Sequence, residues 1–153
     1  MHEHENVDVV KDAYLAFSEG NFDVLLECLS EDVKWFAIGP PDLIPTAGTR
    51  YGPEQVEQYF SLLEANGDLR KLRPVEFIAQ DDKVVAIGDM QADVKATGRS
   101  IRSPWVHVFT LHHGKITQFR SFYDTAAMVS VLENQMQARP RRRTSELNSP
   151  AIF

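Results

Sequence analysis

The sequence predicts an α+β domain in which a curved antiparallel sheet, packed with N-terminal helices, encloses a pocket. Apolar residues recur at helical spacing in residues 7–29 and 53–66, whereas residues 69–123 contain four long stretches of strand type joined by short turns. Strands joined by such short links pair antiparallel. Helices segregated from an antiparallel sheet define the α+β class, and a long curved sheet covered by helices can enclose a cavity for a small apolar ligand.

Two helices are expected first. Val10, Tyr14 and Phe17 recur at three- or four-residue intervals, which places them on one face of a helix. Gly20 follows the last of them and ends this helix. Asn21 can cap a short second helix, so the chain begins with a helical hairpin.

A strand, a loop and a third helix follow. Residues 33–38 are aromatic and β-branched, which is typical of a strand. Residues 39–45 contain three prolines and cannot continue a central strand, so we expect a hydrophobic loop suited to the rim of a pocket. Gly52-Pro53 begins the third helix, and Asn66-Gly67 ends it.

The second half of the chain is expected to form a four-stranded meander and a last helix. The breaks between the strands contain residues that tolerate tight-turn backbone angles, as in Thr97-Gly98 and His113-Gly114. A last helix is expected from about Thr125, with an apolar face that includes Met136. The four strands are predicted at residues 69–80, 83–95, 99–111 and 115–123.

Composition excludes several classes of protein. The 153 residues are 43% hydrophobic, which suits one domain with a core, and 22 acidic against 16 basic residues give a net charge of −6. Nucleic-acid binders present a basic face, so that class is disfavoured. The single cysteine, Cys28, excludes an intramolecular disulfide framework and a Cys-rich zinc site. No apolar run approaches the roughly 20 residues of a membrane span, and residues 1–6 are polar, so we expect a soluble, cytoplasmic protein.

The charge is unevenly placed along the chain. Residues 138–153 carry four of the 16 basic residues, all arginine, and only Glu146 opposes them. This segment lacks helical or strand periodicity and contains two prolines, which predicts a basic, flexible tail. The folded domain is therefore expected at residues 5–137.

Three segments together resemble a known superfamily. They are residues 19–23 (Glu-Gly-Asn-Phe-Asp), residues 51–54 (Tyr-Gly-Pro-Glu) and residues 105–109 (Trp-Val-His-Val-Phe). In this order of elements they resemble the nuclear-transport-factor-2-like superfamily, and within it the SnoaL-like and ketosteroid-isomerase-like group. The resemblance covers residues 5–137 and implies a conical α+β fold with a deep pocket, which commonly dimerises through its sheet.

The activity is less constrained than the fold, because this superfold carries isomerases, cyclases, epoxide hydrolases and binding domains. Ketosteroid isomerases use an aspartate base, a tyrosine and a protonated acid. Aligned on the resemblance, this chain has Ala37, Ala13 and His107 at those positions, so steroid isomerisation by that set is not expected. Tyr14 lies one position from the expected tyrosine.

His107 and Asp124 are the candidate catalytic residues. His107 lies between Trp105 and Phe109 on one face of a predicted strand, where burial would lower the pKa of an acid/base group. The alternative is a core histidine satisfied by a neighbour. Asp124 follows the last strand and could orient His107 or a water, although an aspartate before Thr125 is also an excellent helix N-cap.

Aromatic residues provide the expected walls and hydrogen-bonding groups of the pocket. Each could instead be a core residue with a satisfied polar tip. Arg120 alternates with Phe119 and so faces the opposite side of its strand, toward a dimer interface or a surface pair; an Arg–Asp pair like that of epoxide hydrolases is an alternative. The predicted ligand-binding residues are Tyr14, Trp35, Trp105, Phe109, Phe119 and Tyr123.

Two functional hypotheses follow. The first is a cofactor-independent SnoaL-like enzyme, an isomerase, a polyketide-cyclase-like protein or an epoxide-hydrolase-like protein, which uses acid/base catalysis on a small apolar carbonyl or polycyclic compound. The second is a non-catalytic ligand-binding or dimerisation module of the same fold. No phosphate loop, dinucleotide fingerprint or metal-ligand spacing occurs, so no cofactor or metal is expected. A homodimer through the sheet is expected, with no nucleic-acid or membrane partner.

Overall fold

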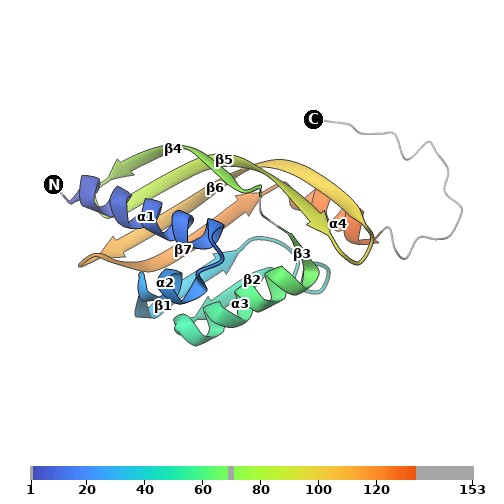
Figure 1. Cartoon of the computed structure of the whole chain (residues 1–153), viewed down its shortest axis with the longest axis horizontal. Helices are drawn as coiled ribbons and strands as arrows, with labels where there is room; N and C mark the ends of the chain where they lie inside the picture. The colour runs from blue at the N-terminus through green and yellow to red at the C-terminus, as the bar shows by residue number, and fades with distance from the viewer. Residues whose placement is uncertain (1, 69–70, 134–153) are drawn as a thin grey trace, which may run out of the picture.

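The computed structural model describes residues 2–68 and 71–133. Over these residues, seven strands form one sheet in the order β2-β1-β7-β6-β5-β3, and β4 also pairs with β5 (Figure 1). The strands are β1 (Leu29–Ala37), β2 (Gly48–Tyr51), β3 (Gly67–Asp68), β4 (Arg73–Gln80), β5 (Lys83–Val94), β6 (Arg99–His112) and β7 (Lys115–Tyr123). The helices are α1 (Glu3–Ser18), α2 (Phe22–Glu27), α3 (Gly52–Asn66) and α4 (Thr125–Glu133).

The predicted helical hairpin is confirmed. Helix α1 ends at Ser18, and Gly20 adopts a positive φ of 71°, a conformation that glycine takes at little cost. The Asn21 side chain accepts a hydrogen bond from the Val24 amide at 3.4 Å and so caps α2.

The antiparallel meander is also confirmed. Strand β5 pairs antiparallel with β4 and with β6, and β6 pairs antiparallel with β7. The β5–β6 register is continuous from Lys83↔Thr110 to Val94↔Arg99. This long regular pairing places alternate residues of β6, including Trp105, His107 and Phe109, on the same buried face.

The beginning of the sheet differs from the prediction. Strand β1 starts at Leu29 rather than at residue 33, and it pairs parallel with β7, with Trp35 opposite Phe119. Residues 48–51 form the short strand β2, which the sequence did not predict. The strand predicted from residue 69 instead begins at Arg73; residues 69–70 lie outside the described part of the chain.

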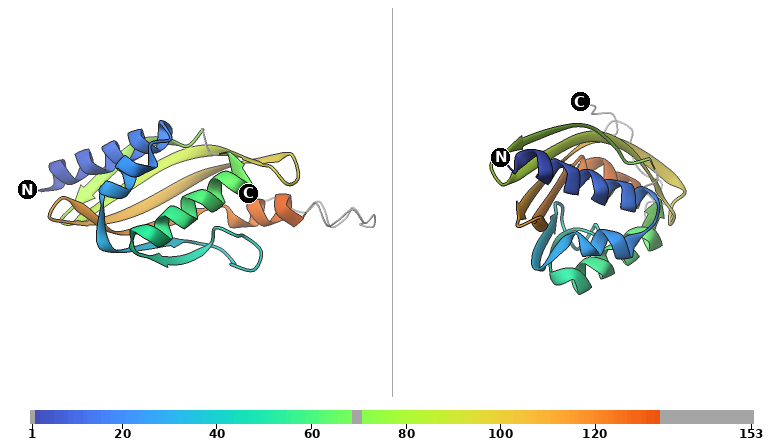
Figure 2. Two further views of the ribbon diagram at one scale, coloured as in Figure 1. Left: turned by 60° about the horizontal axis from the view of Figure 1, so that its bottom comes forward. Right: turned by 60° about the vertical axis from the view of Figure 1, so that its left-hand side comes forward.

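The helices lie on the concave side of the curved sheet, as expected (Figure 2). Helix α1 crosses this side, and α2 and α3 close it opposite the long strands. The core therefore lies between the helices and the inner face of the sheet. Its fully buried members include Val10 of α1, Val33 of β1, Val56 of α3 and Val84 of β5.

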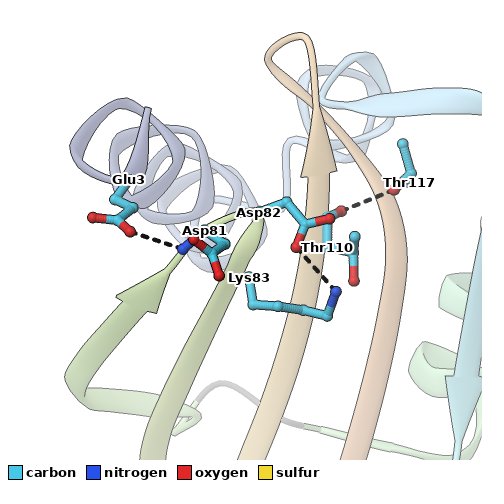
Figure 3. Close-up of polar contacts among 6 residues, drawn as sticks. All are labelled: Glu3, Asp81, Asp82, Lys83, Thr110 and Thr117. Carbon is cyan, nitrogen blue, oxygen red and sulfur yellow. Dashed lines mark hydrogen bonds and ion pairs between the residues drawn. The ribbon is translucent and has the colours of Figure 1, made fainter. Parts of the chain in front are cut away.

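Polar contacts join elements at the end of the sheet that contains the β4–β5 turn (Figure 3). Glu3 at the start of α1 accepts a hydrogen bond from the Asp81 amide at 2.8 Å, which ties the helix to the β4–β5 turn. Asp81 has a φ of 54° there. Between β6 and β7, the Thr117 hydroxyl donates to the Thr110 carbonyl at 3.2 Å. The first contact ties the start of α1 to the sheet, and the second joins β6 to β7.

No helix in residues 2–68 and 71–133 is both long and apolar enough to cross a membrane. The predicted basic tail at residues 138–153 and the predicted helical position of Met136 lie outside the described residues.

Candidate functional site

A cavity of about 140 Å³ lies between the helices and the concave face of the sheet. A cavity of about 150 Å³ lined by apolar residues is large enough to hold benzene. The walls come from α1, α3 and α4, from the inner faces of β1, β5, β6 and β7, and from the loop before β2. The six predicted ligand-binding residues and His107 all line the cavity: Tyr14, Trp35, Trp105, His107, Phe109, Phe119 and Tyr123.

Tyr14 and His107 form the polar centre of the cavity. The Tyr14 hydroxyl oxygen lies 2.6 Å from His107 Nδ1, a short hydrogen bond between α1 and β6. The two rings are nearly parallel, with an interplanar angle of 8° and centroids 5.9 Å apart. Tyr14 is therefore a cavity residue as well as part of the apolar stripe of α1.

Aromatic rings surround His107 on several sides. Trp105 stacks on it with centroids 4.1 Å apart, and the edge of Phe119 approaches it at 4.9 Å. Burial lowers the pKa of His107 to about 3 and raises the pKa of Tyr14 above its ordinary range. Both groups are consequently neutral at pH 7, and the site holds a hydrogen-bonded neutral pair.

The tautomer of His107 decides which donor faces a ligand. When Nδ1 carries the proton, it donates to the Tyr14 oxygen, and the Tyr14 O–H is free to donate elsewhere. When Nε2 carries the proton, Tyr14 donates to Nδ1 and the Nε2–H is the free donor. Under either tautomer, the pair offers one hydrogen-bond donor to an oxygen in the cavity.

Asp124 lies apart from this centre. It is exposed and does not line the cavity; its carboxylate accepts a hydrogen bond from the Ala127 amide at 3.0 Å and so caps α4. Its own amide donates to the buried Ser103 hydroxyl at 3.0 Å. The predicted His107–Asp124 partnership is not formed, and Tyr14 takes the place of Asp124 beside the imidazole.

Strand β7 divides its side chains between two faces, as the alternation predicts. Phe119, Ser121 and Tyr123 line the cavity, whereas Arg120 lies on the outer face of the sheet. An Arg–Asp catalytic pair built on Arg120 would need its guanidinium in the cavity, and the structure does not place it there. The register sets Ser121 directly opposite His107, so a third polar group adjoins the pair.

Tyr59 of α3 is a cavity residue that the sequence analysis did not single out. It is one of the apolar residues that recur at helical spacing in residues 53–66, and in the structure it is a buried residue of α3 that lines the cavity. Burial raises the pKa of Tyr59, while Arg50 and the indole of Trp35 partly oppose this rise. The hydroxyl on an otherwise apolar helical stripe was the available signal for a polar role.

The loop of residues 39–47 forms part of the cavity wall, as predicted for a pocket rim. Ile44 is buried, and Pro45 and Thr46 line the cavity. The Arg50 guanidinium donates to the carbonyl of Thr46 at 2.5 Å and of Pro45 at 3.3 Å, and it lies 5.1 Å from the centre of the Tyr59 ring. Arg50 thus fastens the loop to α3.

Metal binding has no support in the described residues. Within residues 2–68 and 71–133, His, Cys, Asp and Glu side chains nowhere gather in threes around a point that could hold an ion. Tyr14, His107 and the neighbouring hydroxyls of the cavity can form hydrogen bonds and transfer protons.

Comparison with known proteins gives a consistent result. A family model described as a SnoaL-like domain matches residues 10–119. An NTF2-like protein from Burkholderia xenovorans LB400 is 30% identical, with a TM-score of 0.78 over 86% of this chain and 98% of that one. An NTF2-like protein of unknown function from Burkholderia pseudomallei K96243 is 26% identical, with a TM-score of 0.77 over 83% and 96%.

A third solved structure contains a named small molecule. TerC, co-crystallised with polyporic acid, is 25% identical to this chain, with a TM-score of 0.76 over 84% of this chain and 98% of that one. The comparison with curated proteins gives no match.

Proposed function

Because the chain belongs to the SnoaL-like family of NTF2-like proteins, we propose that its cavity binds a small, largely apolar carbonyl compound and promotes proton transfer at the carbon beside the carbonyl. The observation that carries this proposal is the 2.6 Å contact between Tyr14 and His107 inside an aromatic cavity. TerC, a structural neighbour, was crystallised with polyporic acid, which supports a small-molecule ligand for this fold.

The proposed chemistry uses the tautomer with a proton on His107 Nδ1. Nε2 then takes a proton from the carbon beside the carbonyl, and the C–H electron pair moves into the enolate. Nδ1–H donates to the Tyr14 oxygen, while the Tyr14 O–H donates to the enolate oxygen. The charges that develop on the imidazole and the enolate are opposite and close, so an apolar cavity tolerates their formation as a pair.

The enolate can then react in two ways. When the enolate is conjugated with a C=C bond, return of the proton from Nε2 to the far carbon of the dienolate restores the carbonyl, shifts the double bond and is an isomerisation. Attack of the enolate carbon on a second carbonyl of the same molecule is a cyclisation, in which a C–C bond forms and the resulting alkoxide takes the proton from Nε2. Both reactions need only the groups present in the cavity.

The test follows proton exchange on a simple ketone. In D₂O, the protein is expected to accelerate loss of the methyl proton signal of 2-acetylnaphthalene in NMR spectra, and His107→Gln is expected to abolish the acceleration. Tyr14→Phe should weaken binding of the ketone about tenfold, the equivalent of one net hydrogen bond. Binding without acceleration in the wild-type protein would contradict the catalytic role.

One observation favours a binding function without turnover as the second candidate. Burial lowers the pKa of His107 to about 3, which makes the imidazole a weak base until an anion forms beside it. In that case the Tyr14–His107 pair would serve only to orient a ligand oxygen. The exchange experiment separates the two functions, because a binding module retains affinity and leaves the exchange rate unchanged.

We also propose that two chains pair through the outer face of the sheet. This face carries half-buried apolar residues, among them Val85, Val106 and Val108. The Arg120 Nε and Thr110 Oγ1 atoms on the same face are buried without hydrogen-bond partners. A partner surface would cover the apolar residues and could supply acceptors for both polar atoms.

A further inference from the structure

The cavity contains polar groups that the Tyr14–His107 chemistry does not use. Trp35 is only 5% exposed and lines the cavity, and its Nε1 is buried without a well-directed hydrogen bond. A buried indole N–H usually finds an acceptor; this one is close enough to the Tyr59 hydroxyl to lower its pKa but makes no well-directed hydrogen bond, so it can donate to a ligand oxygen. The hydroxyls of Tyr59 and Tyr123 also belong to the cavity wall.

These three groups gather in one part of the cavity. The ring of Tyr59 lies 5.8 Å from that of Trp35, and the indole lowers the pKa of the Tyr59 hydroxyl without an aligned hydrogen bond between them. Burial and the proximity of Tyr59 raise the pKa of Tyr123 to about 12. Tyr59 of α3 is therefore within electrostatic reach of both Trp35 of β1 and Tyr123 of β7.

Phe119 separates Trp35 from the Tyr14–His107 pair. The Phe119 ring stacks on Trp35 with ring centroids 3.9 Å apart. It also contacts the His107 ring, with ring centroids 4.9 Å apart. Along β7, Tyr123 lies two residues beyond Ser121, the partner of His107, a displacement of about 7 Å. The polar region around Trp35 and Tyr59 and the Tyr14–His107 pair thus lie on opposite sides of the Phe119 ring, in a cavity lined mostly by apolar residues.

We propose that Trp35 Nε1 and the hydroxyls of Tyr59 and Tyr123 form a second polar subsite, which binds an oxygen at the far end of the ligand. The ligand class is then a compact aromatic molecule with an oxygen at each of two opposite ends, such as a hydroxyaryl ketone. This inference rests on the proposed function, because it takes the first oxygen to be the one at Tyr14 and His107.

Arg50 explains why this subsite favours an oxygen atom with partial negative charge. Its guanidinium lies 5.1 Å from the centre of the Tyr59 ring and opposes the effect of burial on the Tyr59 hydroxyl. A positive charge behind Tyr59 strengthens its O–H as a donor. A phenolic or carbonyl oxygen would therefore receive hydrogen bonds from Tyr59, Tyr123 or Trp35, with Arg50 behind them.

The experiment compares two probes that differ by one hydroxyl: 6-acetyl-2-naphthol and 2-acetylnaphthalene. By isothermal titration calorimetry, the wild-type protein is expected to bind the hydroxylated probe about tenfold more tightly, the equivalent of one net hydrogen bond. Tyr123→Phe and Tyr59→Phe, each of which keeps the ring, should bring this ratio to within about twofold of one. The exposed Tyr51, as Tyr51→Phe, is the matched control and should leave the ratio unchanged.

The outcomes separate the two proposals. A ratio near one in the wild-type protein, or a tenfold ratio that survives both tyrosine substitutions in folded protein, overturns the second subsite alone. Failure of 2-acetylnaphthalene to bind, or binding that Tyr14→Phe does not weaken, overturns the proposed function and with it the subsite. Circular dichroism and thermal melts confirm that each variant is folded before its ratio is interpreted.

Discussion

His107 is a titratable ring whose surroundings favour its neutral form. It is 7% exposed and contacts Trp105, Phe119 and Tyr14, and burial lowers its pKa to about 3. The imidazole in an unfolded chain has a pKa near 6.5. Below that value the unfolded chain binds a proton that the folded chain does not, so the contribution of His107 to stability falls as the pH falls.

The predicted pH dependence has a defined size and window. Between pH 7 and pH 5, this single difference in pKa is expected to lower the free energy of unfolding by about 2 kcal/mol. Above pH 6.5 the contribution is fully present, and toward pH 3 it is lost. Urea unfolding of the wild-type and His107→Gln proteins at pH 7 and pH 5 gives the change in free energy of unfolding with pH for each protein. The same change in both proteins would show that the buried imidazole titrates normally.

Substitutions of Asp124 distinguish a helix-capping role of this residue from a catalytic role. Asp124→Asn removes the charge but keeps a good capping oxygen, whereas Asp124→Ala removes both. Since the carboxylate accepts the Ala127 amide and does not line the cavity, we expect Asp124→Ala to lower stability by about 1 kcal/mol and Asp124→Asn to lower it far less. Thermal unfolding measures both effects.

The proton-exchange rate of 2-acetylnaphthalene completes that comparison. Both Asp124 variants are expected to retain the wild-type rate while they remain folded. A large loss of rate in Asp124→Asn with unchanged stability would restore the aspartate as the partner of His107.

At the scale of elements, Gly88 of β5 shows how the cavity keeps its shape. A Cβ at this position would meet the Arg73 carbonyl of β4 and the Trp105 ring, whose Cζ2 would lie 2.5 Å away. The glycine therefore allows Trp105 to lie against the sheet and line the cavity beside His107. An added methyl group must displace the indole, the neighbouring strand or both.

Gly88→Ala is expected to lower the free energy of unfolding by about 3 kcal/mol and to weaken binding of 2-acetylnaphthalene. Gly98→Ala is the control, because its Cβ would meet nothing within 4 Å and only its φ of 71° is unfavourable. We expect Gly98→Ala to lose about 1 kcal/mol and to keep the ligand affinity. Equal losses of affinity in the two variants would contradict the packing role of Gly88.

Local patterns explain which elements were predictable. Helix α1, the cap of α2 and the hairpins of β4 to β7 depend on neighbouring residues, and all of them were predicted. The parallel pairing of β1 with β7 joins residues more than 80 positions apart, such as Trp35 and Phe119, so no local pattern could indicate it. Strand β2 was missed because four residues are too short to show an alternation.

The same limit applies to the candidate site. Alternation along β6 predicted that Trp105, His107 and Phe109 share a face, and they do. The residue that hydrogen-bonds to His107 depends on how α1 is rotated about its axis over the sheet. A shift of one residue along α1 moves a side chain from the core to the cavity. The sequence therefore indicated Tyr14 as a cavity residue but not its hydrogen bond to His107.

At the scale of the whole molecule, the outer face of the sheet exposes apolar residues from several neighbouring strands. The outer face of the sheet carries half-buried residues such as Val108 and Phe122 around Arg120, whose Nε is buried without a partner. Strand β4 adds Ile78 to this face, since Ile78 is 52% exposed and lies opposite Val85 in the β4–β5 register. The outer face combines apolar area with unsatisfied polar atoms in the middle of the sheet, so it is the surface that we expect a second copy to cover.

Sedimentation velocity at micromolar concentration is expected to give twice the monomer mass for the wild-type protein. Val108 lies opposite Arg120 in the β6–β7 register, so Val108→Arg would place like charges side by side in the interface and should yield a folded monomer. Leu15→Arg, the matched control on the exposed side of α1, lies away from the sheet face and should remain dimeric. Because the cavity opens on the concave side and the proposed interface lies on the convex side, the monomeric variant should still bind 2-acetylnaphthalene with wild-type affinity. A monomeric wild-type protein, or dissociation caused by Leu15→Arg instead, would overturn the assignment of this face.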